Sequence, residues 1–305
     1  MKNISLYLTL WLLCTTQSAL SQFEPTDAET TFAVNWVAKT DSDSSDLNRL
    51  VATMFAQRHD LPELASLLSG SMGDSHYEIL RYSTMSYDCL LKEATDTCVD
   101  TNFPDVLVQT DAENIMPYIY SIIENDNNNN KEAALQALVK ANRSTITNDY
   151  YFDKVVLVRQ VLKQSAYPPK QVNDAAEVLA GAKQLYEMYL RLRSICKTES
   201  AVSTDWKHHC LSLGRRLEIE SKTAFQYVFG LSIQLNVLDD SSTGREEKLA
   251  VDERRKAFGA LRDTLAKQVS WWSDRSMKPD QIYQSIQEIG EVQTYQKVYA
   301  ELQAH

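Results

Sequence analysis

The chain has 305 residues, with 31 Lys or Arg and 41 Asp or Glu, so its formal net charge at pH 7 is −10. An acidic surface repels phosphate backbones and anionic lipid, which argues against nucleic acid and membrane surfaces as partners. Only 8 Gly and 7 Pro leave few of the breakers that a protein of strands and turns needs. The composition therefore predicts an all-α protein.

The first 21 residues have the order of a secretory signal peptide. Lys2 precedes an apolar stretch from Ile4 to Thr15, and small and polar residues follow it. This order predicts cleavage after Ser21 and an exported mature chain. A lipoprotein alternative would use Cys14, but two leucines precede this cysteine where a small residue would be expected. The apolar stretch is also shorter than the ~20 residues that span a bilayer.

The segment from residue 22 to residue 146 predicts helices joined by short connections. Thr26 or Asp27 can cap a first helix, and Ser44 or Ser45 can cap a second, because apolar residues follow each of them at helical spacing. Two shorter helices are predicted at about 61–68 and 77–91.

Residues 111–146 predict a helical hairpin. Its first helix covers 115–123 and carries Pro117 in the first turn, where a missing N–H costs little. A polar run at 125–130 ends this helix, and a second helix extends from Lys131 to Ala141.

This hairpin resembles one tetratricopeptide repeat, a unit of two antiparallel helices. Tyr118 falls where that family has a large aromatic residue, although Ile122 stands where a small one is expected. The small, large and small packing positions of the second helix are Ala134, Leu138 and Ala141. The resemblance covers about a tenth of the chain and implies a short stacked array with a concave surface. It also implies a protein or peptide partner that contacts Tyr118.

The segment from residue 147 to residue 305 predicts a bundle of longer antiparallel helices, separate from the preceding region or continuous with it. The expected helices lie at about 149–163, 169–197, 204–221, 223–238, 245–272 and 278–302. The stretch at 223–238 carries no charge, but three polar side chains interrupt it. It therefore predicts a buried central helix and not a membrane span. We therefore expect no membrane anchor after cleavage.

Four cysteines remain once Cys14 leaves with the signal peptide. In an exported protein an even number favours disulfides, and the local pairings are Cys89–Cys98 and Cys196–Cys210. Helical phase places both members of the second pair on the seam of a helical hairpin. The alternative is buried, reduced thiols.

No catalytic or cofactor motif stands out. His208 and His209 are weak candidates for metal ligands, but they point about 100° apart on a helix, so a solvated helix start is the simpler interpretation. Trp271 either lines a binding groove or packs between helices, since Trp272 belongs to the core stripe. Asn142, Arg143 and Ser144 match a glycosylation acceptor.

These observations favour a non-catalytic exported scaffold that binds another protein, with no cofactor. An exported helical hydrolase with a site assembled from several helices, and a structural component of the envelope, are the alternatives. The acidic helical chain with two cysteine pairs resembles envelope proteins of Gram-negative bacteria, which implies the periplasm. Full secretion is the alternative location.

Overall fold

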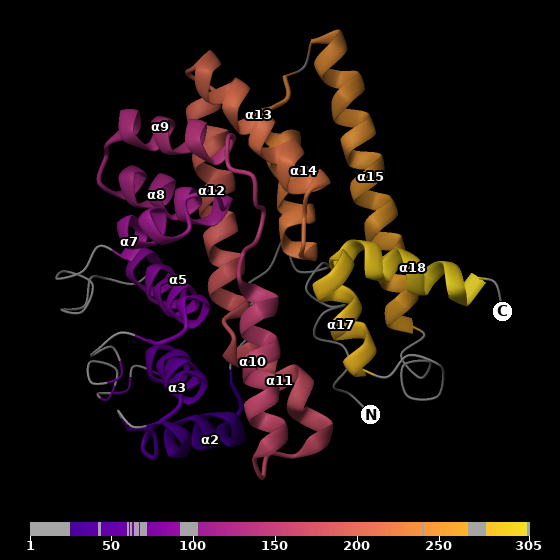
Figure 1. Cartoon of the computed structure of the whole chain (residues 1–305). Coiled ribbons are helices and arrows are strands. Elements are labelled where there is room, and N and C mark those ends of the chain that lie inside the picture. Colours follow the sequence, from indigo (N-terminus) through magenta and orange to yellow (C-terminus); the bar gives the residue numbers. More distant parts are fainter. Residues whose placement is uncertain are drawn as a thin grey trace. The chain divides into compact units, whose positions relative to one another are not determined.

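The fold is that of a computed structural model (Figure 1), which describes residues 25–41, 44–59, 61, 63, 67, 72–91, 103–239, 241–267 and 279–303. In these ranges the regular structure consists of fourteen α-helices and one short 3₁₀ helix, which confirms the all-α class. None of the described helices has both the length and the apolar content needed to cross a bilayer.

The chain divides into two compact units that interleave along the sequence. One, the cavity unit, holds Leu20–Ala112 and Tyr150–Met188, and the other, the hairpin unit, holds Glu113–Asp149 and Tyr189–His305 among its segments. The sequence predicted one boundary near residues 145–148, whereas the described chain changes unit after residues 112, 149 and 188. A single cut along the chain therefore does not separate the two units.

The cavity unit is built on α3 (Asp46–Arg58), which packs against α2 (Asp27–Val37), α5 (Ser75–Leu91) and α10 (Tyr151–Gln164). Its core residues Leu50, Val51 and Phe55 are fully buried. The unit also contains α7 (Phe103–Thr110), which packs on α5, α11 (Val172–Leu179), which packs on α10, and the start of α12 (Ala182–Ser200).

The predicted N-caps in this unit are confirmed. The Thr26 hydroxyl accepts a hydrogen bond from the Glu29 N–H, and the Glu29 carboxylate accepts one from the Thr26 N–H. This reciprocal arrangement satisfies two donors at the start of α2. Ser45 caps α3 by accepting from the Asn48 N–H at 3.4 Å.

The predicted helix at 169–197 is wrong in one respect, because it is divided into α11 and α12. Gly181, between them, has a φ of +98°, a left-handed conformation that favours glycine. Apolar side chains on both sides keep helical spacing, with Val178, Ala182 and Leu185 all buried, so the stripe alone does not reveal the break.

The hairpin unit contains the predicted hairpin, formed by α8 (Ile115–Asn127) and α9 (Lys131–Ala141), whose chain turns back between them (Figure 1). Asn114 caps α8, and Asn130 caps α9. The predicted packing residues of α9, Ala134, Leu138 and Ala141, have no exposed surface. The hairpin is therefore confirmed, and its likeness to a tetratricopeptide repeat stays a prediction.

The rest of the hairpin unit comprises the later part of α12 and five further helices. These are α13 (Thr204–Ile219), α14 (Ala224–Val237), α15 (Ser242–Lys267), α17 (Pro279–Ile289) and α18 (Glu291–Gln303). As predicted, α14 is a mostly buried helix, and Thr223 caps it together with Gln226. The predicted helix at 278–302 is divided at Gly290, which has a φ of +88°.

Two features hold α13 to its neighbours. The Cys196–Cys210 disulfide joins α12 to α13, with an S–S distance of 2.10 Å and both residues fully buried, as predicted. One turn after Cys210 on α13, Gly214 meets Gly230 of α14 so closely that a β-carbon on Gly230 would lie 2.6 Å from the Gly214 oxygen. These contacts leave no space between the helix backbones at the crossing.

A buried carboxylate connects α18 to the start of α14. Glu291 has no exposed surface, and it accepts hydrogen bonds from the Ala224 N–H and from the Tyr295 hydroxyl, both at 2.6 Å. Burial raises the pKa of Glu291, while these two hydrogen bonds act in the opposite direction. The carboxylate thus satisfies a free N–H of the first turn of α14.

Candidate functional site

Of the residues predicted to bind a partner or a metal, the structure describes Tyr118, His208 and His209, which lie on two different helices. Tyr118 is half-buried on α8, and Trp271 lies outside the described residues. His208 and His209 lie on α13 with ring centroids 5.1 Å apart, and burial followed by the charge of His208 lowers the pKa of His209. Within the described part of the chain, no three His, Cys, Asp or Glu side chains are grouped to hold a metal ion.

Two further predictions concern the second cysteine pair and the glycosylation acceptor. The Cys89–Cys98 bond stays a prediction because Cys98 lies outside the described residues, as do Ser21 and the whole predicted signal peptide. Asn142, the predicted glycosylation acceptor, lies at the end of α9, and its Nδ2 donates to the His209 carbonyl at 3.0 Å.

A shallow hollow of about 270 Å³ lies on α13. Its described lining residues are His208, Leu211, Ser212, Arg215, Arg216, Ile219 and Glu220. Six of these belong to α13 and Glu220 is its C-cap, so the described residues form a single wall. Two of its cations are already paired, because Arg215 bonds Glu247 and Arg216 bonds Glu220. This hollow is therefore the weaker candidate for a site.

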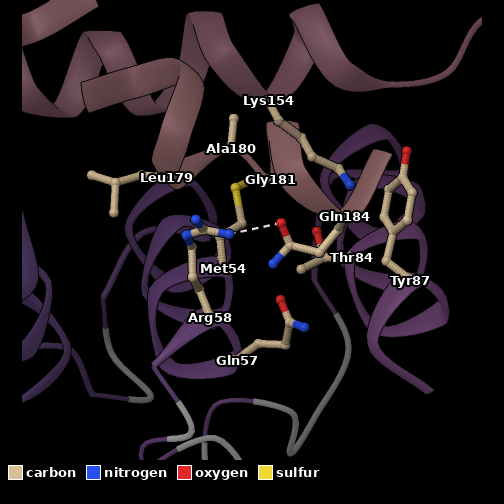
Figure 2. Close-up of a pocket in the computed structure, with 10 residues that line it drawn as sticks. All are labelled: Met54, Gln57, Arg58, Thr84, Tyr87, Lys154, Leu179, Ala180, Gly181 and Gln184. Carbon is tan, nitrogen blue, oxygen red and sulfur yellow. Dashed lines mark hydrogen bonds between the residues drawn. The ribbon is translucent and has the colours of Figure 1, made fainter. Parts of the chain in front are cut away.

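A better enclosed cavity lies within the cavity unit, and Figure 2 shows the ten described residues that line it. They come from α3, α5 and α10, from the end of α11, from the start of α12 and from the two residues that join α11 to α12. The lining residues are Met54, Gln57, Arg58, Thr84, Tyr87, Lys154, Leu179, Ala180, Gly181 and Gln184. Because the walls belong to packed helices, the polar groups are held in fixed positions.

Two cations line this cavity. Lys154 is only 2% exposed, and its Nζ lies 4.6 Å from the centroid of the Tyr87 ring, which is a cation–π contact. Arg58 is half-buried, and its Nη1 donates a hydrogen bond to Oε1 of Gln184 at 2.7 Å. Figure 2 shows the polar ends of these side chains approaching the cavity from different sides. None of the ten described lining residues is acidic.

Neutral polar groups complete the lining. Gln57 is 3% exposed, and its Nε2 has no hydrogen-bond partner. The Thr84 hydroxyl donates to the Leu80 carbonyl at 2.8 Å, so its oxygen is left as an acceptor. A buried amide N–H without a partner costs about 1–3 kcal/mol unless something enters to accept from it. Gln57 is therefore the clearest sign that the cavity receives an acceptor.

The cavity is small. The space among its lining atoms is about 250 Å³ when the open mouth is counted, but the part that can hold the centre of a water molecule is only about 10 Å³. This is about the smallest volume that holds one water. Only a single small polar group fits at its end.

A separate acidic cluster lies elsewhere in the cavity unit, where Glu29 of α2 and Asp174 of α11 lie close to Tyr167. Burial, followed by the charge of Glu29, raises the pKa of Asp174 to about 6. Burial and Glu29 also raise the pKa of the Tyr167 hydroxyl. Phe32 packs edge-on against Tyr167 with centroids 5.3 Å apart, which makes the surroundings apolar. Neither of the two hollows described above is lined by these three residues.

Sequence reasoning did not identify the cavity residues, although one signal was present. Lys154 lies three residues after Tyr151 and four before Val158, both buried, so it stands on the apolar stripe of α10. A charged residue on such a stripe is buried with the stripe. Gln57 and Arg58 gave no comparable signal, because polar residues at the end of a helix are ordinarily solvated.

Comparison of the sequence with protein-family models and with curated proteins, and of the fold with solved structures, finds no significant match.

Proposed function

We propose that this chain is an exported, non-catalytic helical scaffold that binds another protein, and that the cavity unit carries the contact. The observation that supports this proposal best is the size of the cavity. Sites for small molecules are several hundred Å³ in volume and enclose most of the ligand. A space of about 10 Å³ admits one group and leaves the rest of the ligand outside. A polypeptide partner that inserts only one side chain or one chain end would fit such a space.

The packing of the cavity unit supports the same proposal. The lining groups come from helices whose cores are fully buried, as at Phe55 of α3 and Leu80 of α5. A rigid wall lowers the entropic cost of binding, since little has to be ordered when the partner arrives. Stacked helical hairpins in other proteins present such walls to segments of their partners.

Export to the periplasm, or full secretion, is part of the proposal. It is supported by the order of residues 1–21 and by the Cys196–Cys210 bond, because disulfides persist in oxidising compartments. Sequencing the N-terminus of the natural protein tests this step, and we expect it to begin at Gln22. A chain that retains Met1 in a reducing cytoplasm would contradict it.

Site-specific crosslinking tests the protein contact. A photoreactive residue at position 183, between Gly181 and Gln184 in the chain, is expected to capture one reproducible protein in cells of the native host. The control places it at position 249, since Leu249 lies on α15 in the other unit and is 67% exposed. The capture at position 183 should disappear in the Arg58→Gln variant. Equal capture at both positions, or capture that Arg58→Gln leaves unchanged, contradicts the proposal.

A second candidate function is an exported hydrolase, and the acidic cluster is the observation that favours it. A carboxyl with a pKa near 6 beside a second carboxylate can give and take protons near neutral pH. Hydrolytic activity in a substrate screen that is lost in Asp174→Asn, but not in Arg58→Gln, would place this function first.

A further inference from the structure

The acidic cluster of the cavity unit lies beside aromatic rings of α2, and the two features together suit a positive charge. We infer that an organic ammonium ion binds where this cluster meets the rings of Phe32 and Trp36. The inference goes beyond the proposed function, because these residues do not line the cavity. A lysine side chain of another protein and a free alkylammonium ion both carry this chemistry.

Two carboxylates supply the negative charge. Glu29 is 6% exposed and Asp174 is half-buried, and among the described side chains no Lys, Arg or His forms an ion pair with either of them. Burial, followed by the charge of Glu29, raises the pKa of Asp174 to about 6, so Asp174 is still mostly ionised at neutral pH. Like charges in a partly dry site repel each other, and a cation that enters compensates both.

Tyr167 adds an oxygen at the same place. It is 5% exposed, and no acceptor lies in hydrogen-bond geometry with its hydroxyl, although Glu29 is near enough to add to the effect of burial in raising its pKa. A buried tyrosine hydroxyl ordinarily finds a partner. An ammonium N–H that enters can donate to this oxygen while the hydroxyl hydrogen turns toward Glu29.

Aromatic rings stand beside these oxygens. The rings of Phe32 and Tyr167 are nearly perpendicular, with an interplanar angle of 80° and centroids 5.3 Å apart. Trp36, one turn further along α2, stacks on Phe32 with centroids 5.9 Å apart. Ring faces attract cations through their quadrupole, and they do so more strongly where water is excluded. A cation held between carboxylates and rings therefore gains from both.

The cluster has a closed side and an open side. Phe55, which packs edge-on against Phe32, has no exposed surface, and it belongs to the closed side. Phe32, Trp36 and Asp174 are half-buried, so part of each side chain contacts solvent. A ligand can therefore reach the cluster without unfolding of the unit.

The mixture of groups favours an organic cation over a metal ion. Ca²⁺ takes about six or more oxygen ligands, and ring carbons are not among them. In the part of the chain that the structure describes, no three His, Cys, Asp or Glu side chains are grouped to hold a metal ion. An alkylammonium ion uses carboxylates, the phenol oxygen and ring faces together.

The test uses the full mature chain with n-butylammonium as the probe, because this ion reproduces the end of a lysine side chain. Its neutral counterpart of similar shape is 1-butanol. The indole N–H signal of Trp36 is followed by NMR in each titration at constant ionic strength. We expect n-butylammonium to move this signal along a saturable curve, and 1-butanol to move it at least about 10-fold less at the same concentration. Equal shifts from both would overturn the inference.

A charge variant separates the cluster from general charge effects. Asp174→Asn keeps the shape of the side chain and removes its charge, so it should weaken n-butylammonium binding at least about 5-fold. Because burial disfavours the charge of Asp174, its removal is not expected to unfold the chain.

The matched control is Asp27→Asn, since Asp27 is exposed in the first turn of α2 and loses the same charge. It should leave binding within about 2-fold, because solvent and salt screen an exposed charge. Equal weakening by the two variants would overturn the inference, because the effect would then follow net charge alone.

A second variant tests the rings. Phe32→Leu keeps an apolar side chain and removes the ring, and it should weaken n-butylammonium binding at least about 3-fold. Thermal unfolding reports whether this variant is folded, and where it is not the Asp174→Asn measurement decides alone. A folded Phe32→Leu that binds as well as the natural protein would overturn the inference, because carboxylates alone would then explain the binding.

Two further probes identify the source of the cation and test for a metal. Tighter binding of Nα-acetyl-lysine methylamide than of tetramethylammonium assigns the site to a lysine side chain, and the reverse order assigns it to a free quaternary ammonium ion. Both orders support the inference. If Ca²⁺ moves the Trp36 signal at lower concentration than n-butylammonium does, the cluster is a metal site and the inference is wrong.

Discussion

The two units pack helices in opposite ways at their central crossings. In the hairpin unit, Gly214 and Gly230 let the backbones of α13 and α14 touch, so nothing can enter. In the cavity unit, long polar side chains such as Gln57, Lys154 and Gln184 stand among the helices and leave a small space. Small residues close a helix crossing, whereas large polar residues hold one open. The comparison separates a crossing that is closed by backbone contact from one that leaves a small polar space.

The largest effect is expected from a substitution at the crossing of α13 and α14. Gly230→Ala places a β-carbon 2.6 Å from both the Glu218 nitrogen and the Gly214 oxygen, which are backbone atoms that cannot move alone. We expect a loss of about 3 kcal/mol in the free energy of unfolding, measured by urea denaturation.

The control for that variant is Gly73→Ala in the cavity unit. A β-carbon there would lie 3.3 Å from Oδ2 of Asp46, the flexible end of a side chain. We expect a change below about 1 kcal/mol, since alanine also restricts the unfolded chain. Similar losses from both substitutions would contradict the close crossing.

The second effect removes the covalent link between α12 and α13. The double variant Cys196→Ala with Cys210→Ala should lose about 3 kcal/mol of unfolding free energy, because the bond closes a loop across a sequence separation of 14. Urea denaturation with and without a reductant measures it.

The same variant tests the other predicted disulfide. Any destabilisation that the reductant still causes in it reports a bond between Cys89 and Cys98. If unfolding of the natural protein did not respond to the reductant, both bonds would be rejected.

The third effect concerns Gln57, which lines the cavity. Gln57→Leu removes an amide N–H that has no partner and keeps a similar volume, so stability should stay within about 1 kcal/mol of the natural protein or rise. Thermal unfolding checks this. A loss as large as that of Gly230→Ala would mean that Gln57 serves the fold and not a ligand.

The smallest effect is on the pH dependence of stability. Burial and Glu29 raise the pKa of Asp174 from 3.8 to about 6, so the folded chain binds this proton more tightly than the unfolded chain does. The stability from this group is therefore present at low pH and is lost as pH rises from about 4 to 6.

Replacing that carboxyl tests the direction. Asp174→Asn should make the free energy of unfolding depend less on pH between pH 4 and pH 7. The change over this range should shrink by about 1 kcal/mol or less, because the carboxyl is partly exposed to solvent. Denaturation at a series of pH values measures the slope. A variant that loses stability more steeply than the natural protein over this range would contradict the assignment.

Local signals predicted most of the helices. Thr26 and Ser45 each cap the helix that the sequence placed after them, because a capping hydroxyl acts within three residues of itself. The breaks at Gly181 and Gly290 were missed, because apolar side chains keep their phase across a single left-handed residue. α7 was not predicted at all.

The cavity could not be predicted from the sequence, for a different reason. Its polar residues come from positions 57 to 184, and each is unremarkable beside its own neighbours in the chain. Only the folding of α3, α10 and the start of α12 around one space turns Gln57, Lys154 and Gln184 into one surface. Sequence periodicity shows which side of a helix is buried but not which helix it meets. The interleaved order of the two units could not be predicted for the same reason.

The bond from Asn142 to the His209 carbonyl has a consequence for any sugar on this chain. The amide nitrogen that an oligosaccharyltransferase would modify is engaged once α9 and α13 have packed. A glycan on Asn142 would therefore record attachment to a chain that was still unfolded. Because the glycosidic bond replaces one of the two hydrogens of this nitrogen, such a chain would keep the contact only through the hydrogen that remains.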